Sequence, residues 1–237
     1  METFVTLLDY SAVPTKCFLK DANVKRKISC LCDNTFEVDV PEEINLELNP
    51  EYLKEILEGN FFTFNCESCG KKHKPEFPLF VLWPSKKIRF EIFTELDRGE
   101  FYRRKKPPLF KDSYTLETII GYPEMADRIA VINDGFEPVP VEAIKYFLQL
   151  KAEEEYKDDE LNIWYYGFSG DKAGDGQLEF HIHGIKENEV AVMKIPLALY
   201  RKYLDDYKRR PKNEIYKALR VRSYLSVKNT MWPEELR

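Results

Sequence analysis

The sequence has no hydrophobic run close to the roughly 20 residues that a helix needs to cross a bilayer. Its N-terminal stretch lacks a basic start and a long apolar segment, so it is atypical of a secretion signal. Internal repeats and low-complexity tracts are also absent from the sequence. We therefore expect a cytoplasmic protein that makes no contact with a membrane.

The composition does not fit a disordered chain. Of the 237 residues, 43% are hydrophobic, 14% are aromatic and 32% are charged. This balance is typical of a packed core with a charged surface, whereas disordered chains have few aromatic residues. The length suits one large domain, or a domain with extensions.

Charge is unevenly distributed along the chain. The net charge is −5, yet residues 201–237 hold 11 Lys and Arg against 5 Asp and Glu. A basic C-terminal segment can bind nucleic acid or an acidic protein, or it can neutralise the acidic remainder of the same molecule. The overall acidity opposes long-range attraction to phosphate, so we do not favour nucleic acid as the partner.

Cysteine is scarce, but four of the five cysteines form two close pairs. Cys30 and Cys32 make the first pair, and Cys66 and Cys69, followed by Gly70, make the second. In a reducing compartment such pairs indicate a metal site rather than disulfides. Four thiolates on two tight turns suit tetrahedral zinc, so the pattern predicts a structural zinc site of the zinc-ribbon type.

Other interpretations of the cysteines remain open. The thiols can be buried without a ligand, or they can form a redox disulfide. Because a single residue separates Cys30 from Cys32, that pair is tighter than usual. Cys17, Asp33 or His73 is an alternative ligand in a distorted site.

A capped helix is predicted between the two cysteine pairs, over residues 50–58. Asn49 is the expected cap, Pro50 suits the first helical position and Gly59 suits the stop. The expected buried face consists of Leu53, Ile56 and Leu57. Alternating residues predict strands at 35–40, 77–83 and 87–93, the last two as a hairpin.

The second half of the chain is predicted to mix helices and strands. A polar link covers residues 98–113, and a helical piece lies near residues 116–120. A helix is expected over residues 141–154, with Val141, Ile144, Phe147 and Leu148 buried. Strands are expected at 162–168, 177–184 and 190–194, and helices at 196–209 and 213–221.

The cysteine region resembles the bacterial and archaeal CpXC domain family. The matching stretches are 28–32, 44–50, 59–70 and 77–81, with weaker likeness at 126–129, 134–135 and 142–145. The pattern of that family is Cys-Pro-any-Cys. Here the first pair lacks the proline and is one residue short, and Glu67 replaces the proline of the second pair. The resemblance implies a fold and a zinc site held by Cys30, Cys32, Cys66 and Cys69, but it supplies no reaction.

The expected fold class is α+β, with zinc-ribbon-like hairpins and an inserted helix, then a mixed helix and antiparallel-strand part, and a helical C-terminal end. We expect an N-terminal extension over residues 1–27 and a CpXC-like domain over 28–195. Within that domain, 28–97 is the cysteine ribbon part and 114–195 the helix and strand part. Residues 196–237 form a basic helical extension.

Two other groups of residues are candidates for function. Glu179, His181 and His183 alternate along a predicted strand and share one face, where they would serve a metal-dependent enzyme. The basic run Arg103, Arg104, Lys105 and Lys106 follows two aromatic residues. It is a possible contact for nucleic acid or for a partner protein.

The sequence thus favours a zinc-stabilised interaction module with a protein partner and with no recognisable enzyme motif. The two alternatives are a metal-dependent enzyme that uses the Glu179, His181 and His183 face, and a nucleic-acid-binding zinc ribbon that uses the basic patches.

Overall fold

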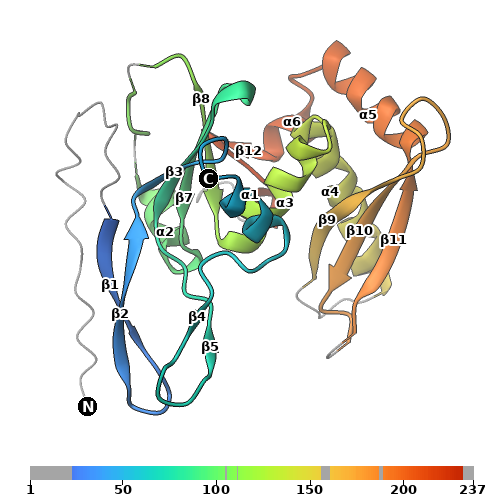
Figure 1. Cartoon of the computed structure of the whole chain (residues 1–237). Helices are drawn as coiled ribbons and strands as arrows, with labels where there is room; N and C mark the ends of the chain where they lie inside the picture. Colours follow the sequence, from blue (N-terminus) through green and yellow to red (C-terminus); the bar gives the residue numbers. More distant parts are fainter. Residues whose placement is uncertain (1–22, 105, 111, 156–160, 187–188, 232–237) are drawn as a thin grey trace.

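The computed structural model describes residues 23–104, 106–110, 112–155, 161–186 and 189–231. Within them the chain has a mixed α and β fold with antiparallel hairpins and several helices, as the sequence predicted. Figure 1 shows three parts side by side: a sheet with two projecting hairpins, a central group of helices, and a second sheet. None of the helices in these ranges is long and apolar enough to cross a membrane.

A six-stranded mixed sheet organises the first part. Its strand order is β12-β13-β8-β7-β6-β3. The bounds are β3 Glu43–Asn45, β6 Leu79–Trp83, β7 Ile88–Phe93, β8 Thr115–Ile120, β12 Arg220–Val221 and β13 Tyr224–Leu225. Strands β6 and β7 form the predicted antiparallel hairpin, joined by the 3-10 turn η1 Pro84–Lys86.

Strand β8 corrects the prediction of a helical piece near residues 116–120. It pairs in parallel with β7, so that Ile119 lies opposite Ile92 and Ile120 opposite Phe93. All four side chains are buried. The β-branched isoleucines suit a buried sheet, and pairing with a distant strand overrides the local helical signal.

Helices α1 Pro50–Leu57 and α3 Tyr122–Asn133 pack against each other and against the first core. The predicted helix at 50–58 is confirmed, and Gly59 adopts the left-handed conformation expected at its stop. Two details were wrong. Asn49 makes no side-chain cap hydrogen bond, and Leu57 is 40% exposed.

The second sheet has the order β11-β10-β9 and is antiparallel. Its strands are β9 Asn162–Ser169, β10 Gln177–His183 and β11 Ala191–Pro196, which confirms the three predicted strands with small shifts of their ends. Helices α4 Pro138–Glu155 and α5 Leu197–Arg209 share a core with this sheet. In α4, Val141, Ile144 and Leu148 are buried as predicted, but Phe147 is 43% exposed.

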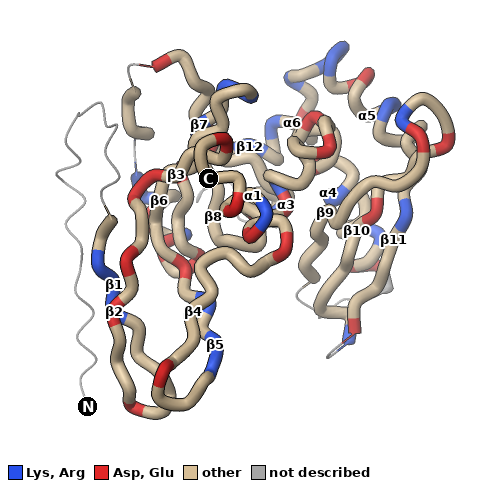
Figure 2. The backbone as a smooth tube through the Cα atoms, viewed as in Figure 1, with Lys and Arg blue, Asp and Glu red and all other residues tan. Residues whose placement is uncertain are grey.

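The C-terminal segment returns to the six-stranded sheet. After α5 come α6 Glu214–Ala218, then β12 and β13, and then the 3-10 helix η3 Val227–Met231. The predicted helix at 196–209 is present, but the one predicted at 213–221 is shorter, and its last residues form strand β12 instead. Figure 2 shows Lys and Arg along α5. The expected domain boundaries stay a prediction, although the start at residue 28 lies inside β1, and β13 pairs with β8 of the central sheet.

Two thin hairpins project together from the six-stranded sheet (Figure 1). One consists of β1 Asn23–Ser29 and β2 Thr35–Pro41, and the other of β4 Phe64–Asn65 and β5 Lys72–His73. The predicted polar link at 98–113 starts instead with helix α2 Arg98–Arg103, which follows the 3-10 turn η2 Glu95–Asp97. The two hairpins carry the cysteine pairs at their tips.

Candidate metal centre

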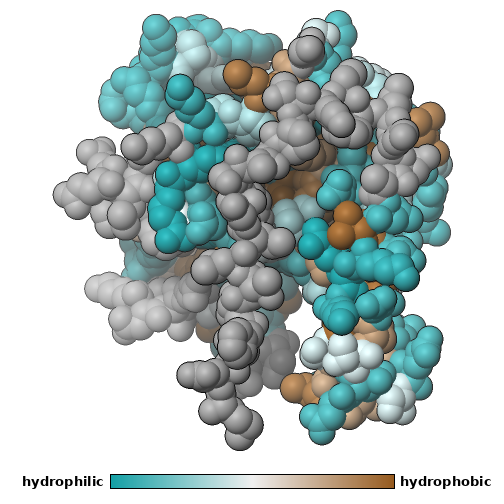
Figure 3. All heavy atoms as spheres, turned by 90° about the vertical axis from the view of Figure 1, so that its left-hand side faces the viewer, coloured by the Kyte–Doolittle hydropathy of each residue, from teal (hydrophilic) through white to brown (hydrophobic). Residues whose placement is uncertain are grey.

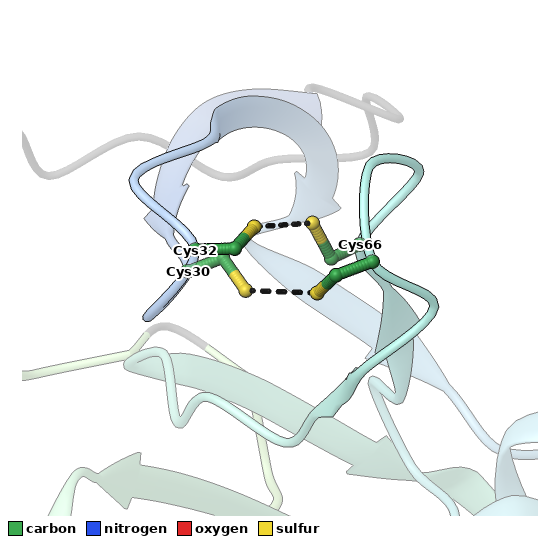
Figure 4. Close-up of side chains that lie close together, drawn as sticks. Cys30, Cys32 and Cys66 are labelled. Atoms are coloured by element: carbon green, nitrogen blue, oxygen red, sulfur yellow. Dashed lines mark hydrogen bonds between the residues drawn. The ribbon is translucent and has the colours of Figure 1, made fainter.

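The first cysteine pair lies in the tight turn that joins β1 to β2. The backbone N–H of Cys30 donates to the carbonyl of Asn34 at 2.8 Å, and the N–H of Asp33 donates to the carbonyl of Cys30 at 3.0 Å. Asp33 has a φ of 64°, a conformation that Asp and Asn tolerate better than most residues. This local geometry turns both Cys30 and Cys32 toward the second hairpin (Figure 4).

The second pair lies in the turn between β4 and β5. The N–H of Cys66 donates to the carbonyl of Lys71 at 2.9 Å, and the N–H of Gly70 donates to the carbonyl of Cys66 at 2.7 Å. Gly70 has a φ of 73°, which glycine adopts without steric penalty. The glycine after the pair therefore closes the turn.

The structure brings all four paired cysteines together. Their sulfur atoms lie within 4.8 Å of one another. Across the two hairpins, the Cys30 and Cys69 sulfurs are 3.6 Å apart, and the Cys32 and Cys66 sulfurs are 3.7 Å apart. Cys30 and Cys66 are buried, whereas Cys32 and Cys69 are exposed. The four cysteines, which span up to 39 residues of sequence, thus form one compact cluster. Their sulfur atoms lie close enough together to bind a metal ion.

The sulfur separations match a tetrahedral thiolate site. A zinc–sulfur bond of about 2.3 Å in a regular tetrahedron places the sulfurs about 3.8 Å apart. A disulfide would need about 2.05 Å between sulfurs, and all four cysteines are free. The donor set of four soft sulfurs suits zinc and disfavours magnesium or calcium, which prefer oxygen.

Local hydrogen bonds set the charge of the buried thiols. The side-chain N–H of Asn34 donates to the Cys66 sulfur at 3.5 Å. This contact, with further donation from the backbone near Cys69, outweighs burial and lowers the pKa of Cys66 to about 6. For Cys30, a backbone hydrogen bond from Cys32 lowers the pKa of the thiol. Burial and the neighbouring thiols together raise this pKa by more, so that the net value is about 12. A metal ion would therefore displace protons from the cluster when it binds.

Two of the three alternative ligands, Asp33 and His73, do not join the cluster. The group of potential ligands comprises the four cysteines and includes neither Asp33 nor His73. Asp33 is exposed, and the His73 ring packs edge-on against Phe36 with ring centres 6.0 Å apart. Cys17 lies outside the described residues.

The predicted Glu179, His181 and His183 face exists on strand β10. The Glu179 carboxylate of this face is already bound by neighbouring side chains. His181 Nε2 lies 3.0 Å from Glu179 Oε1, and the Lys194 ammonium lies 3.7 Å from the same carboxylate. The ring of Tyr166 stacks on His181 with centres 3.9 Å apart. Within the described residues, the cysteine cluster is the one group of three or more potential ligands that lie close enough to hold a metal ion, and the β10 face does not form such a group.

The predicted basic patch is partly used inside the fold. The Arg104 guanidinium forms two 2.6 Å hydrogen bonds with the carboxylate of Glu91 and lies over the ring of Phe93. Arg103 is exposed and pairs with Glu100, and Lys106 is exposed. Lys105 lies outside the described residues.

Sequence reasoning missed a buried charge network between α3 and α4. Lys145 contacts both Asp127 and Glu142, and Arg128 contacts Glu142 as well as Glu117. All five side chains have at most 12% of their surface exposed. Four of these residues lie in the stretches 126–129 and 142–145 that resemble the family. This resemblance was the one feature of the sequence that could have pointed to the network. The adjoining cavity has a volume of about 20 Å³, enough for one water-sized molecule.

Comparison with known proteins gives a consistent result. A protein of Treponema pallidum (strain Nichols), described as an "Uncharacterized protein", is 27% identical over 217 residues. The alignment covers 86% of this chain and 97% of that protein. No solved structure matches the chain. Residues 28–145, which hold both cysteine turns as well as α3 and the first half of α4, match the family described as "CpXC protein". Residues 28–145 of this chain are therefore similar to the CpXC family, as the sequence comparison with that family predicted.

Proposed function

We propose that this chain is an interaction module whose two projecting hairpins are stabilised by one structural zinc ion. The observation that carries the proposal is the cluster of four cysteine sulfurs within 4.8 Å at the two hairpin tips. In this proposal Cys30, Cys32, Cys66 and Cys69 are the ligands of a closed tetrahedral site. A site with four protein ligands keeps no open position for a substrate, which is typical of structural rather than catalytic zinc.

The hairpins have little core of their own, which is why we assign the ion a structural role. In the β1–β2 hairpin, Ile28 and Val40 are the buried hydrophobic side chains of the strands. The β4–β5 hairpin has only two residues in each strand. Isolated two-stranded hairpins are marginally stable in water, and a bound metal contributes its binding free energy to folding. The ion would hold the two tips together in a ribbon-like arrangement.

An exposed leucine supports a protein partner. Leu31 lies between the two cysteines of the first turn and is 85% exposed. In Figure 3 the coloured atoms at the lower right of the molecule are a mixture of hydrophilic and hydrophobic ones. A turn held by zinc would present Leu31 as a rigid apolar contact, which suits a pocket on another protein. We place the protein in the cytoplasm, where thiols stay reduced and available to zinc.

Elemental analysis of the purified full chain tests the zinc site. We expect about one zinc per chain in the wild type, and loss of that zinc in Cys66→Ser and Cys69→Ser. Cys17→Ser is the matched control, because Cys17 belongs to neither close cysteine pair of the sequence, and this variant should keep the zinc. A wild-type chain that folds normally with four free thiols and no metal would refute the proposal.

A photo-crosslinking residue at position 31 tests the interaction. We expect a covalent adduct with one defined protein in cells of the source organism. The same probe at position 96 is the control, because Leu96 is 97% exposed on a different element. An identical adduct pattern from both positions would argue against contact through the cysteine turn.

A further inference from the structure

We propose that peroxides oxidise the cysteine centre to two disulfides with a fixed pairing, Cys30 with Cys69 and Cys32 with Cys66. The pairing is inferred from the sulfur geometry alone. The accompanying loss of zinc rests on the proposed function, because it requires that the ion is present at the start. Such a centre would report oxidising conditions by releasing its metal while the two hairpins stay joined.

The pairing follows from the two sulfur contacts that have hydrogen-bond geometry. Both join one hairpin to the other: Cys30 to Cys69 at 3.6 Å, and Cys32 to Cys66 at 3.7 Å. Closing either pair to a disulfide needs the sulfurs to approach to about 2.05 Å, which rotation of the side chains and a small shift of the two turns can supply. The proposed bonds are nested, since Cys32 and Cys66 lie between Cys30 and Cys69 in the sequence.

Each proposed pair combines one accessible and one protected sulfur. Cys32 and Cys69 are exposed, whereas their partners Cys66 and Cys30 are buried. A peroxide can therefore reach the first sulfur of each pair, and the second sulfur is held beside it away from bulk solvent. This arrangement of an accessible thiol next to a resolving thiol is typical of cysteines that oxidise reversibly.

The chemistry balances with hydrogen peroxide as the oxidant. The exposed thiolate attacks one peroxide oxygen, which breaks the O–O bond, forms a sulfenic acid and releases hydroxide. The buried thiolate then attacks the sulfenic sulfur, forms the S–S bond and expels a second hydroxide. Each pair thus loses two electrons to one peroxide molecule. Two pairs consume two peroxide molecules, and the zinc leaves as Zn²⁺ because no thiolate remains to bind it.

The two disulfides would replace the ion as the link between the hairpins. Both bonds run from the β1–β2 turn to the β4–β5 turn, so neither hairpin is released when the metal leaves. Pairing within a turn would have the opposite effect, because it would close Cys66 onto Cys69 and leave the hairpins unconnected. The disulfide pairing therefore decides whether the two projecting hairpins stay connected after oxidation.

Peptide mapping of the oxidised full chain tests the pairing. A Cys17→Ser chain, purified under reducing conditions, is treated with hydrogen peroxide, and released zinc is followed with a chromogenic chelator. The protein is then alkylated and cleaved after glutamate, which separates Cys66 from Cys69 at Glu67 but leaves Cys30 and Cys32 on one peptide. We expect one product of three linked peptides and release of the full zinc content, with both reversed by a dithiol reductant.

Fragmentation of the three-peptide product between Cys30 and Cys32 assigns the individual bonds. Cys30 linked to Cys69 supports the proposal, and Cys30 linked to Cys66 overturns it. A separate Cys66–Cys69 product, or thiols that remain reduced in excess peroxide, also overturns it. Purified protein that lacks zinc but still forms both cross-hairpin bonds would contradict the proposed zinc function and support the pairing.

Single substitutions give an independent check. In Cys32→Ser we expect the Cys30–Cys69 bond to form while Cys66 stays open to alkylation. In Cys69→Ser we expect the Cys32–Cys66 bond to form while Cys30 stays open. A Cys30–Cys66 bond in either variant would overturn the pairing. Should either variant fail to fold, the map of the Cys17→Ser chain decides on its own.

Discussion

Lys145 donates a 2.8 Å hydrogen bond to Glu142 one helical turn earlier, and both side chains are buried in the interior of the protein. The same ammonium group also contacts Asp127 of α3. Removal of a single partner from a buried ion-pair network leaves the remaining charges without compensation. The network therefore joins α3 to α4, and loss of any one of its charged side chains would destabilise the contacts of the others.

Lys145→Met should lower the free energy of unfolding by about 3–5 kcal/mol, because Asp127 and Glu142 would stay buried without their cation. Lys151→Met is the matched control, since Lys151 is exposed on the same helix. It should change stability by less than about 0.5 kcal/mol. Urea unfolding of both variants measures the difference, and equal effects would mean that the network adds nothing beyond packing.

Glu142 should contribute a pH dependence to stability. Burial raises the pKa of Glu142, but the charges of Lys145 and Arg128 outweigh this effect and lower it below the ordinary value of 4.5. A carboxyl group with a lowered pKa stabilises the folded state above its ordinary pKa, and this stabilisation is lost as the pH falls through the folded value. The stability difference between wild type and Glu142→Gln should thus be largest near neutral pH and shrink below about pH 4.5.

Urea unfolding of both proteins between about pH 7 and pH 3 tests this expectation. Glu154→Gln is the control, because Glu154 is exposed near the end of the same helix. A difference for Glu142→Gln that grows as the pH falls would contradict the assigned sign.

Ile56 and Leu57 are neighbours in α1 that should respond differently to truncation. Ile56 is 1% exposed and belongs to the first core, whereas Leu57 is 40% exposed. Ile56→Ala should lower the free energy of unfolding by about 2–5 kcal/mol, and Leu57→Ala by less than about 1 kcal/mol. Chemical denaturation ranks the two, and a larger effect at Leu57 would mean that the helix is rotated from the orientation described.

Gly176, in the loop that joins β9 to β10, should not tolerate a side chain, although Gly167 in β9 should. A Cβ atom at Gly176 would lie 2.1 Å from Phe168 and 2.9 Å from the backbone oxygen of Asp171, whereas one at Gly167 meets nothing within 4 Å. Gly176→Ala should therefore lower stability by about 1–3 kcal/mol through overpacking. Thermal unfolding of both alanine variants provides the comparison, and similar melting temperatures would rule out the close approach.

The sequence predicted the elements whose stability is mostly local. The β6–β7 hairpin, the α1 helix and the three strands of the second sheet have clear periodicity and turn signals, and all are present. The spacing of the cysteines also predicted their assembly, because each pair lies in one short turn. Only the meeting of the two turns needed the tertiary structure.

The missed elements depend on distant partners. Strand β8 is held by β7 and by β13, whose Tyr224 lies opposite Thr118 more than a hundred residues away. Helix α3 escaped detection because Asp127 and Arg128 are buried in the charge network, which disrupts the expected pattern of an apolar face. Burial of paired charges cannot be read from periodicity, because the same residues more often face water.

The most direct test of the account is zinc X-ray absorption spectroscopy on the purified full chain. We predict a first coordination shell of four sulfur atoms at about 2.3 Å, contributed by Cys30, Cys32, Cys66 and Cys69. Nitrogen or oxygen atoms in that shell would show that His73, Asp33 or water replaces a thiolate. Such a shell, or a native chain without zinc, would contradict the four-cysteine centre.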